Sequence, residues 1–187
     1  MPSLNIPTIA RSNSFNDGLS SMPLSGDIYT LTIKDVAGEN LITGPDAGAM
    51  MVATWTFAVD LPLDVNVANS KRATGRARFQ EMEFTKAVDA STPTLYANCS
   101  AGTSLGEAKL QVGRISGGEY KEVMSITLTN PIISQISTGG YGEGKVPMDT
   151  FTINFTKCAM EYTAQDPENA TGGKTAFGWD LTTNTAA

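Results

Sequence analysis

Residues 83–102 of this 187-residue chain read EFTKAVDASTPTLYANCSAG. A helix can begin in this stretch at Thr92 and Pro93, because a threonine side chain can cap the free backbone amides of a first turn and proline has no N–H to leave unpaired there. Leu95 lies on the helix face that we expect to be buried. Gly102 suits the left-handed conformation in which many helices end. The stretch therefore predicts one short helix of about two to three turns.

Alternation of apolar and polar residues, which is typical of strands, fills much of the remaining chain. Tyr29, Leu31 and Ile33 share one face of such a run, and residues 51–59 form a second. Similar runs lie at residues 76–85, 108–112, 124–136, 151–162 and 177–181. Together they predict about seven to nine strands. We therefore expect a mainly β fold: an antiparallel β-barrel, closed or nearly closed and made of two packed sheets, with one short α-helix.

Three of these runs are irregular, and in the run 76–85 the uneven alternation indicates a bulge or burial on both faces. The run 124–136 passes through Pro131, which predicts either two consecutive strands or one strand bent at an edge proline. In the run 151–162 the apolar residues change parity near Thr156, which indicates a bulge or a strand covered on both faces. The residues that we expect to anchor the core are Trp55, Phe57, Leu95, Phe155 and Trp179.

Length and composition predict one folded domain with an extension. A hydrophobic content of 41% over 187 residues is enough to bury a sizeable core, so residues 28–187 are predicted to form a single domain. Residues 1–27 are rich in Ser, Asn and Pro with isolated apolar residues, which predicts an extension that is flexible or ordered by a partner.

Charge and cysteine content exclude several classes of protein. The formal charge of −6 argues against a nucleic-acid partner, which needs clustered basic residues. No stretch is apolar enough to insert in a membrane, and the first residues lack the pattern of a cleaved export signal. Cys99 and Cys158 are predicted to be free thiols, because a chain of this size needs no disulfide.

The sequence offers little for catalysis or for a cofactor. The chain contains no histidine, which removes the commonest general base and the histidine-based metal sites. Glu81 and Glu83 share one strand face, where a charged outer surface is a better interpretation than a glycosidase pair. Residues 172–175 read GGKT, but Glu168 stands where a phosphate-binding loop requires glycine. We therefore predict no enzyme, no metal and no cofactor.

The segment quoted first resembles a characteristic segment of the hemolysin-coregulated protein (Hcp) family. The resemblance continues, in the family's order, through residues 108–110 (AKL), 134–140 (SQISTGG), 154–155 (NF) and 178–179 (GW). It spans about residues 28 to 187 but is poor over residues 39–74, and residues 1–27 have no usual counterpart.

The resemblance implies an architectural function. Members of the family form a β-barrel with a short helix, similar to contractile phage tail tube proteins. Homohexameric rings of such subunits stack into a hollow tube of the type VI secretion system, and a contractile sheath propels the tube with its effectors. Implied partners are further copies of the chain, the sheath, spike and baseplate proteins, and effectors in the lumen. The tube would assemble in the bacterial cytoplasm and then be secreted without a cleaved signal peptide.

Two surfaces of the chain are predicted to serve such a tube. Small residues opposite the core face of the run 51–59 are predicted to face the lumen: Val52, Thr54, Thr56 and Ala58. The long loops 37–49 and 60–75 are predicted to join stacked rings, with the basic residues Lys71, Arg72 and Arg76 at the contact. A secreted β-sandwich that binds a carbohydrate or another ligand is the alternative, and it would be a monomer or dimer.

Overall fold

The computed structural model describes residues 27–40, 48–63, 75–116, 119–140, 142, 144–165 and 171–187. The predicted extension 1–27 lies outside these residues except for Asp27, which begins the first strand. The described part contains one helix and thirteen strands, several of only two or three residues. The predicted mainly β class is confirmed, with more strands than the seven to nine that the sequence indicates.

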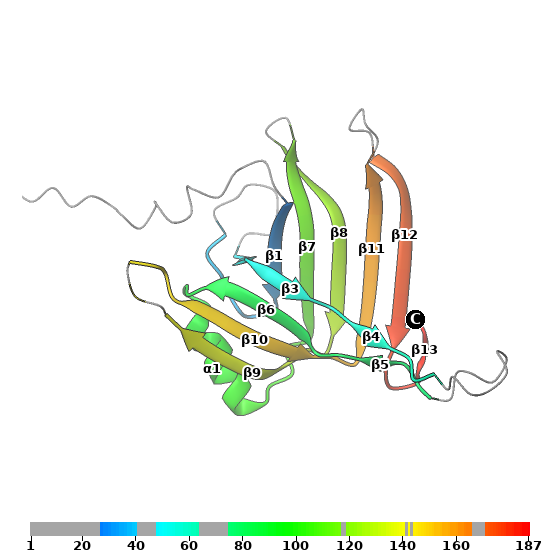
Figure 1. Cartoon of the computed structure of the whole chain (residues 1–187), viewed down its shortest axis with the longest axis horizontal. Coiled ribbons are helices and arrows are strands. Elements are labelled where there is room, and N and C mark those ends of the chain that lie inside the picture. The colour runs from blue at the N-terminus through cyan, green and yellow to red at the C-terminus, as the bar shows by residue number, and fades with distance from the viewer. Residues whose placement is uncertain are drawn as a thin grey trace, which may run out of the picture.

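Sheet A is the larger of the two main sheets and is antiparallel throughout (Figure 1). Its strand order is β13-β12-β11-β8-β7-β1-β2. In chain order its strands are β1 (Asp27–Ile33), β2 (Met50–Val52), β7 (Glu107–Ser116), β8 (Glu119–Thr129), β11 (Lys157–Gln165), β12 (Thr171–Asp180) and β13 (Thr185–Ala186).

Sheet B has four strands in the order β3-β6-β10-β9 and crosses below sheet A in Figure 1. These strands are β3 (Thr54–Thr56), β6 (Met82–Ala87), β9 (Ile132–Gly139) and β10 (Met148–Asn154). A separate two-stranded ribbon pairs β4 (Val59–Asp60) with β5 (Arg78–Phe79). The two packed sheets are as predicted. However, the described strands do not close into one hydrogen-bonded barrel, because each sheet keeps two edge strands.

The core lies between the two sheets. Leu31, Leu110 and Ile126 of sheet A are at most 1% exposed, and so are Phe84 and Phe151 of sheet B. The rings of Phe84 and Phe151 stack with centroids 5.4 Å apart on neighbouring strands. Burial of these large apolar side chains from both sheets is the main stabilising term that holds the layers together.

Four connections carry the chain from one sheet to the other: β6 passes to β7 through the helix, and the other three are short. β2 passes to β3 at Ala53, β8 passes to β9 at Asn130 and Pro131, and β10 passes to β11 at Phe155 and Thr156. The run 124–136 is therefore two consecutive strands, one of the two predicted alternatives. The parity change near Thr156 is a connection between sheets, so both the bulge and the doubly covered strand were wrong interpretations.

The helix α1 (Thr92–Ala101) forms where the sequence predicts it. Gly102 ends it in the left-handed conformation, with φ 61°, and the N–H of Gly102 donates to the carbonyl oxygen of Cys99. The predicted cap at Thr92 was wrong. Ser91 occupies the cap position without a side-chain hydrogen bond to the helix, because the hydroxyl of Ser91 donates to Asp89 instead.

The two cysteines are free thiols, as predicted. Cys158 is buried, and burial raises the pKa of its thiol, so less of the nucleophilic thiolate is present at neutral pH. In the described residues, no helix has the length and apolar character needed to cross a membrane.

Candidate assembly surfaces

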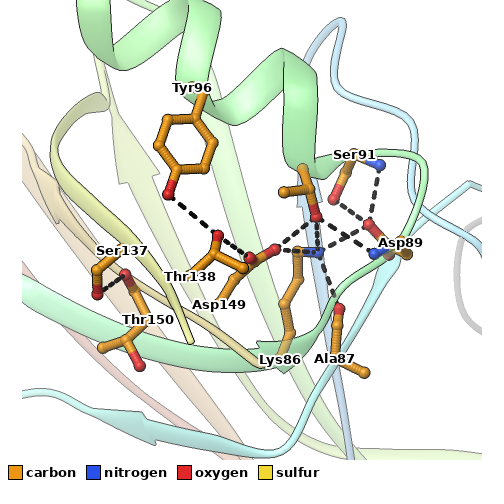
Figure 2. Close-up of polar contacts among 10 residues, drawn as sticks. Lys86, Ala87, Asp89, Ser91, Tyr96, Ser137, Thr138, Asp149 and Thr150 are labelled. Atoms are coloured by element: carbon orange, nitrogen blue, oxygen red, sulfur yellow. Dashed lines mark hydrogen bonds and ion pairs between the residues drawn. The ribbon is translucent and has the colours of Figure 1, made fainter. Parts of the chain in front are cut away.

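A buried lysine joins the central strands of sheet B to the start of the helix. Lys86 on β6 and Asp149 on β10 stand directly opposite one another, and neither side chain is exposed. Lys86 Nζ lies 3.0 Å from Asp149 Oδ2 and 2.7 Å from Asp89 Oδ1. It also donates to the carbonyl oxygen of Ala87 at 3.0 Å and to Thr92 Oγ1 at 3.2 Å (Figure 2). These oxygen partners compensate for the hydration that the ammonium group loses on burial.

The other half of this network fixes the helix on sheet B. Thr92 Oγ1 donates to Asp149 Oδ2 at 2.5 Å, and Thr138 Oγ1 on β9 donates to Asp149 Oδ1 at 2.6 Å. Tyr96 Oη, from the next turn of the helix, donates to Thr138 Oγ1 at 3.1 Å (Figure 2). Side chains from β6, β9, β10 and α1 therefore meet in one polar network, buried at Lys86 and Asp149 and exposed at Thr138 and Tyr96, which we call the Lys86 network.

Hydrogen bonds keep the central carboxylate of this network ionised. Desolvation by burial raises the pKa of Asp149, but hydrogen bonds from Thr138, Thr92 and Lys86, together with the charge of Lys86, outweigh it. The pKa of Asp149 is therefore below its ordinary value. The salt bridge between Lys86 and Asp149 therefore has a structural role. It explains why the segment 83–102 has a charged residue on its strand and a threonine at the start of its helix, since both contact Asp149.

The Lys86 network was not predicted from the sequence, although the alternation of buried and exposed positions contains a signal for it. Lys86 follows Met82 and Phe84 at alternate positions, and Asp149 precedes Phe151 and Ile153 in the same way. All of these residues face the interior. A lysine and an aspartate in step with buried residues on two strands indicate a buried ion pair if the strands are known to be neighbours.

The opposite face of sheet B is polar and nearly neutral. The register aligns two rows of outward-facing residues across all four strands. The first row is Thr54, Thr85, Thr150 and Ser137, and the second is Thr56, Glu83, Thr152 and Gln135. All eight residues are exposed or half-buried, and none of the described elements packs over them. We call these two rows the hydroxyl face.

The predicted lumen-facing residues differ in exposure before and after Ala53. Thr54 and Thr56 are exposed on the hydroxyl face, and Ala58 is half-buried in the segment that follows. Val52 is only 5% exposed and belongs to the core, so its prediction was wrong. The reason is the connection at Ala53, which takes the chain from sheet A to sheet B and exchanges the inward and outward parities.

Two carboxylates stand on the side of the hydroxyl face. Glu81, just before β6, accepts hydrogen bonds from Ser134 Oγ at 2.6 Å and from Asn154 Nδ2 at 3.0 Å. The hydrogen bond from Ser134 is the largest influence on the pKa of Glu81, which is below its ordinary value although partial burial raises it. Glu83 is exposed in the second row.

The two-stranded ribbon forms a second surface with different chemistry. Phe79 of β5 packs against Phe177 and Trp179 of β12, with ring centroids 6.4 and 6.3 Å away, which attaches the ribbon near the C-terminal end of β12 (Figure 1). Val59 on β4 and Leu61 and Leu63 just after it are 52%, 47% and 54% exposed. Three large apolar side chains at alternate positions are a feature of contact surfaces.

A basic concavity lies beside the ribbon. Arg76 donates through Nη2 to the carbonyl oxygen of Leu181 at 3.2 Å. Arg76, Arg78, Leu181 and Asn184 are among the residues that line a space of about 450 Å³. Lys71 and Arg72, the other residues of the predicted ring-stacking contact, lie outside the described residues.

The predicted core anchors all contact the core. Leu95 is fully buried and Phe155 is 4% exposed. Trp55, Phe57 and Trp179 are partly buried and pack against the core residues, and the ring of Trp55 meets Tyr29 edge-on at 6.2 Å.

Among the described residues, no group of three or more His, Cys, Asp or Glu side chains could hold a metal ion.

Comparison with known proteins gives the family. Residues 30–162 match the family described as "Type VI secretion system effector, Hcp". The chain belongs to the Hcp family. Protein hcp1 of Pseudomonas aeruginosa is 34% identical over 113 residues, which cover 60% of this Hcp-family chain and 70% of that protein. This agreement confirms the resemblance seen in the sequence.

Solved structures show the same Hcp-like fold. One described as "Structure of a type six secretion system protein" has a TM-score of 0.80 at 20% identity and covers 87% of this chain and 100% of its own. Hcp1 from Salmonella typhimurium has a TM-score of 0.70 at 19% identity, covering 86% and 99%. This chain is thus a type VI secretion protein with the β-rich fold of Hcp proteins.

Proposed function

We propose that this chain is the structural subunit of the inner tube of a type VI secretion system, with no enzymatic activity of its own. Copies close into homohexameric rings, the rings stack into a hollow tube, and a contractile sheath propels the tube with effectors in its lumen. The observation that carries the proposal is the hydroxyl face, a polar face on a sheet with two open edges.

The open edges give the subunits a way to join. Among the described strands, β3 and β9 each pair on one side only. An edge strand presents unpaired N–H and C=O groups that can pair with another chain. If β3 of one copy lies against β9 of the next, the sheets B join into a continuous wall. The hydroxyl face then covers one side of this wall.

The chemistry of the hydroxyl face suits a lumen. Seven of its eight residues are neutral, with short hydroxyl or amide side chains, and it presents no large apolar group. Such a surface is readily hydrated and offers little area for hydrophobic adhesion. Folded cargo can therefore move along it without being trapped. Thr54 and Thr56 are the predicted lumen residues that belong to this face.

The ribbon provides a contact between stacked rings. A two-stranded ribbon is marginally stable alone, and burial of Val59, Leu61 and Leu63 by a subunit of the next ring would stabilise it. The basic residues Arg76, Lys71 and Arg72 would add an electrostatic contribution to this contact. The sheath, spike and baseplate proteins are the further partners. Assembly takes place in the bacterial cytoplasm, and the tube is then secreted without cleavage of a signal peptide.

The first test is the oligomeric state of the purified full chain. Native mass measurement and negative-stain electron microscopy should show hexameric rings, and tubes at high protein concentration. The alternative function, a β-sandwich that binds a carbohydrate or another ligand, predicts a monomer or dimer. A chain that stays monomeric at high concentration, with no rings in micrographs, contradicts the tube proposal.

The second test concerns the lumen. Thr56→Gln enlarges one side chain of the hydroxyl face without adding charge, so rings should form normally while retention of an effector changes. Thr175→Gln, at an exposed position on β12 of sheet A, is the matched control and should change neither. If Thr56→Gln abolishes the rings, this face has a structural role instead.

A further inference from the structure

Charge is distributed very unevenly between the two faces of sheet B. The four strands of this sheet contain one basic residue, Lys86, and it is buried on the core face opposite Asp149. The hydroxyl face carries the carboxylate of Glu83, and Glu81 stands next to it. In the described strands of sheet B, no cationic side chain shares this face with them.

Glu83 is the exposed and unconstrained carboxylate of this pair. It lies on β6, an interior strand of the sheet, between Thr56 on one side and Thr152 on the other. Neither neighbour carries a charge that could neutralise it, and within the described part of the chain no hydrogen bond or ion pair fixes it. Glu81 differs, because Ser134 and Asn154 hold its carboxylate in place. Glu83 can therefore reorient toward a molecule that passes.

We propose that Glu83 is a specificity-determining residue that makes the lumen favour cargo with a basic surface and disfavour acidic cargo. This inference rests on the proposed function, because it requires that the hydroxyl face line the lumen. A ring places one Glu83 per subunit at the same height, and Glu81 adds a second charge to each. Like charges around a channel with protein walls focus the field inside it more than the same charges on a convex surface.

The composition of the hydroxyl face explains how Glu83 can determine the local electrostatic potential. The seven other residues of the two rows contribute dipoles but no net charge, so the sign of the local potential follows the carboxylates. The preference weakens as salt is added, because exposed charges are screened over about 8 Å at physiological ionic strength. Cargo preference thus depends on ionic strength in a way that shape-based recognition does not.

The experiment compares two probes of equal size and opposite charge on assembled rings. Lysozyme is basic, and succinylation of its lysines makes it acidic. Binding of each probe to rings of the full chain is measured by co-sedimentation at low and at physiological salt. Glu83→Gln should weaken binding of lysozyme at low salt by about two- to fivefold, and Glu83→Lys should reverse the preference toward the succinylated probe.

The matched control removes the same charge elsewhere. Glu107 is exposed at the start of β7 in sheet A, so Glu107→Gln changes the net charge equally without touching the hydroxyl face. If Glu107→Gln weakens lysozyme binding as much as Glu83→Gln does, overall charge explains the effect and the assignment of Glu83 is wrong. Electron microscopy of each variant distinguishes this failure from failure of the proposed function. Absence of rings in the unchanged chain overturns both proposals, whereas intact rings with no probe preference overturn only this one.

Discussion

Replacement of Lys86 by methionine tests whether the Lys86 network holds the domain together. Methionine fills a similar volume but removes the ammonium group that contacts Asp89, Thr92 and Asp149. Asp149 then remains fully buried with hydroxyl donors but no countercharge. The folded state must accommodate an uncompensated carboxylate or protonate it, and either outcome destabilises the fold.

The size of the effect follows from burial. Both Lys86 and Asp149 have side chains that are 0% exposed, and removal of one member of such a pair typically costs about 3–5 kcal/mol. The total free energy of unfolding of a domain is only about 5–15 kcal/mol. For a chain of this length, the loss corresponds to a decrease in Tm of about 6–20 °C.

Urea unfolding followed by circular dichroism at pH 7 measures this loss. All variants are compared at one protein concentration, because assembly itself stabilises the folded state. Lys174→Met is the control: Lys174 pairs with Glu161 at 3.7 Å, but its side chain is 66% exposed, so the change should be below about 1 kcal/mol. The double variant Lys86→Met with Asp149→Leu should recover part of the loss. The reasoning is refuted if Lys86→Met destabilises no more than Lys174→Met.

Three further predictions follow from other features. The pKa of Asp149 is lowered in the folded state, so its contribution to stability is complete above its unfolded-state pKa of about 3.9 and is lost as the pH falls through the folded value. The Asp149→Asn variant should therefore be less stable than the unchanged chain at pH 7. In urea unfolding it should also lose less stability between pH 5 and pH 2. Gly102→Ala should destabilise the folded domain by about 1 kcal/mol, because φ is 61° at this residue. Gly139→Ala should have a much smaller effect in the same assay, because a Cβ atom at residue 139 would have no other atom within 4 Å. Equal effects of the two substitutions would contradict the argument. Charge reversal at Lys71 and Arg72 should shorten tubes in electron micrographs while rings persist, with an effect that shrinks at high salt, and unchanged tubes would count against an electrostatic stacking contact.

The sequence predicts the elements of this fold better than their assignment to sheets. Alternation correctly located most strands, and Pro93 and Gly102 correctly bounded the helix. The errors cluster where the chain changes sheet. At Ala53 and near Thr156, the inward parity inverts because the next strand faces the core from the other side. A parity change in a single sequence cannot be assigned to a bulge or to a change of sheet unless the strand partners are known.

The polar parts of the assembly surfaces were predictable only in part. Thr54 and Thr56 are exposed because they follow the connection at Ala53 and alternate with Trp55. The opposition of Lys86 and Asp149 depends on pairing between strands that lie more than sixty residues apart in the chain. Register over such a separation is set by the packed core, and no local pattern reports it.

The two faces of strand β6 have different roles. Phe84 and Lys86 point inward and maintain the architecture, while Glu83 and Thr85 alternate with them and point outward. Substitution at one set need not disturb the other. A protein engineer could therefore change the chemistry of the hydroxyl face at residues 83 and 85 while leaving the interior untouched, and evolution can vary this face in the same way.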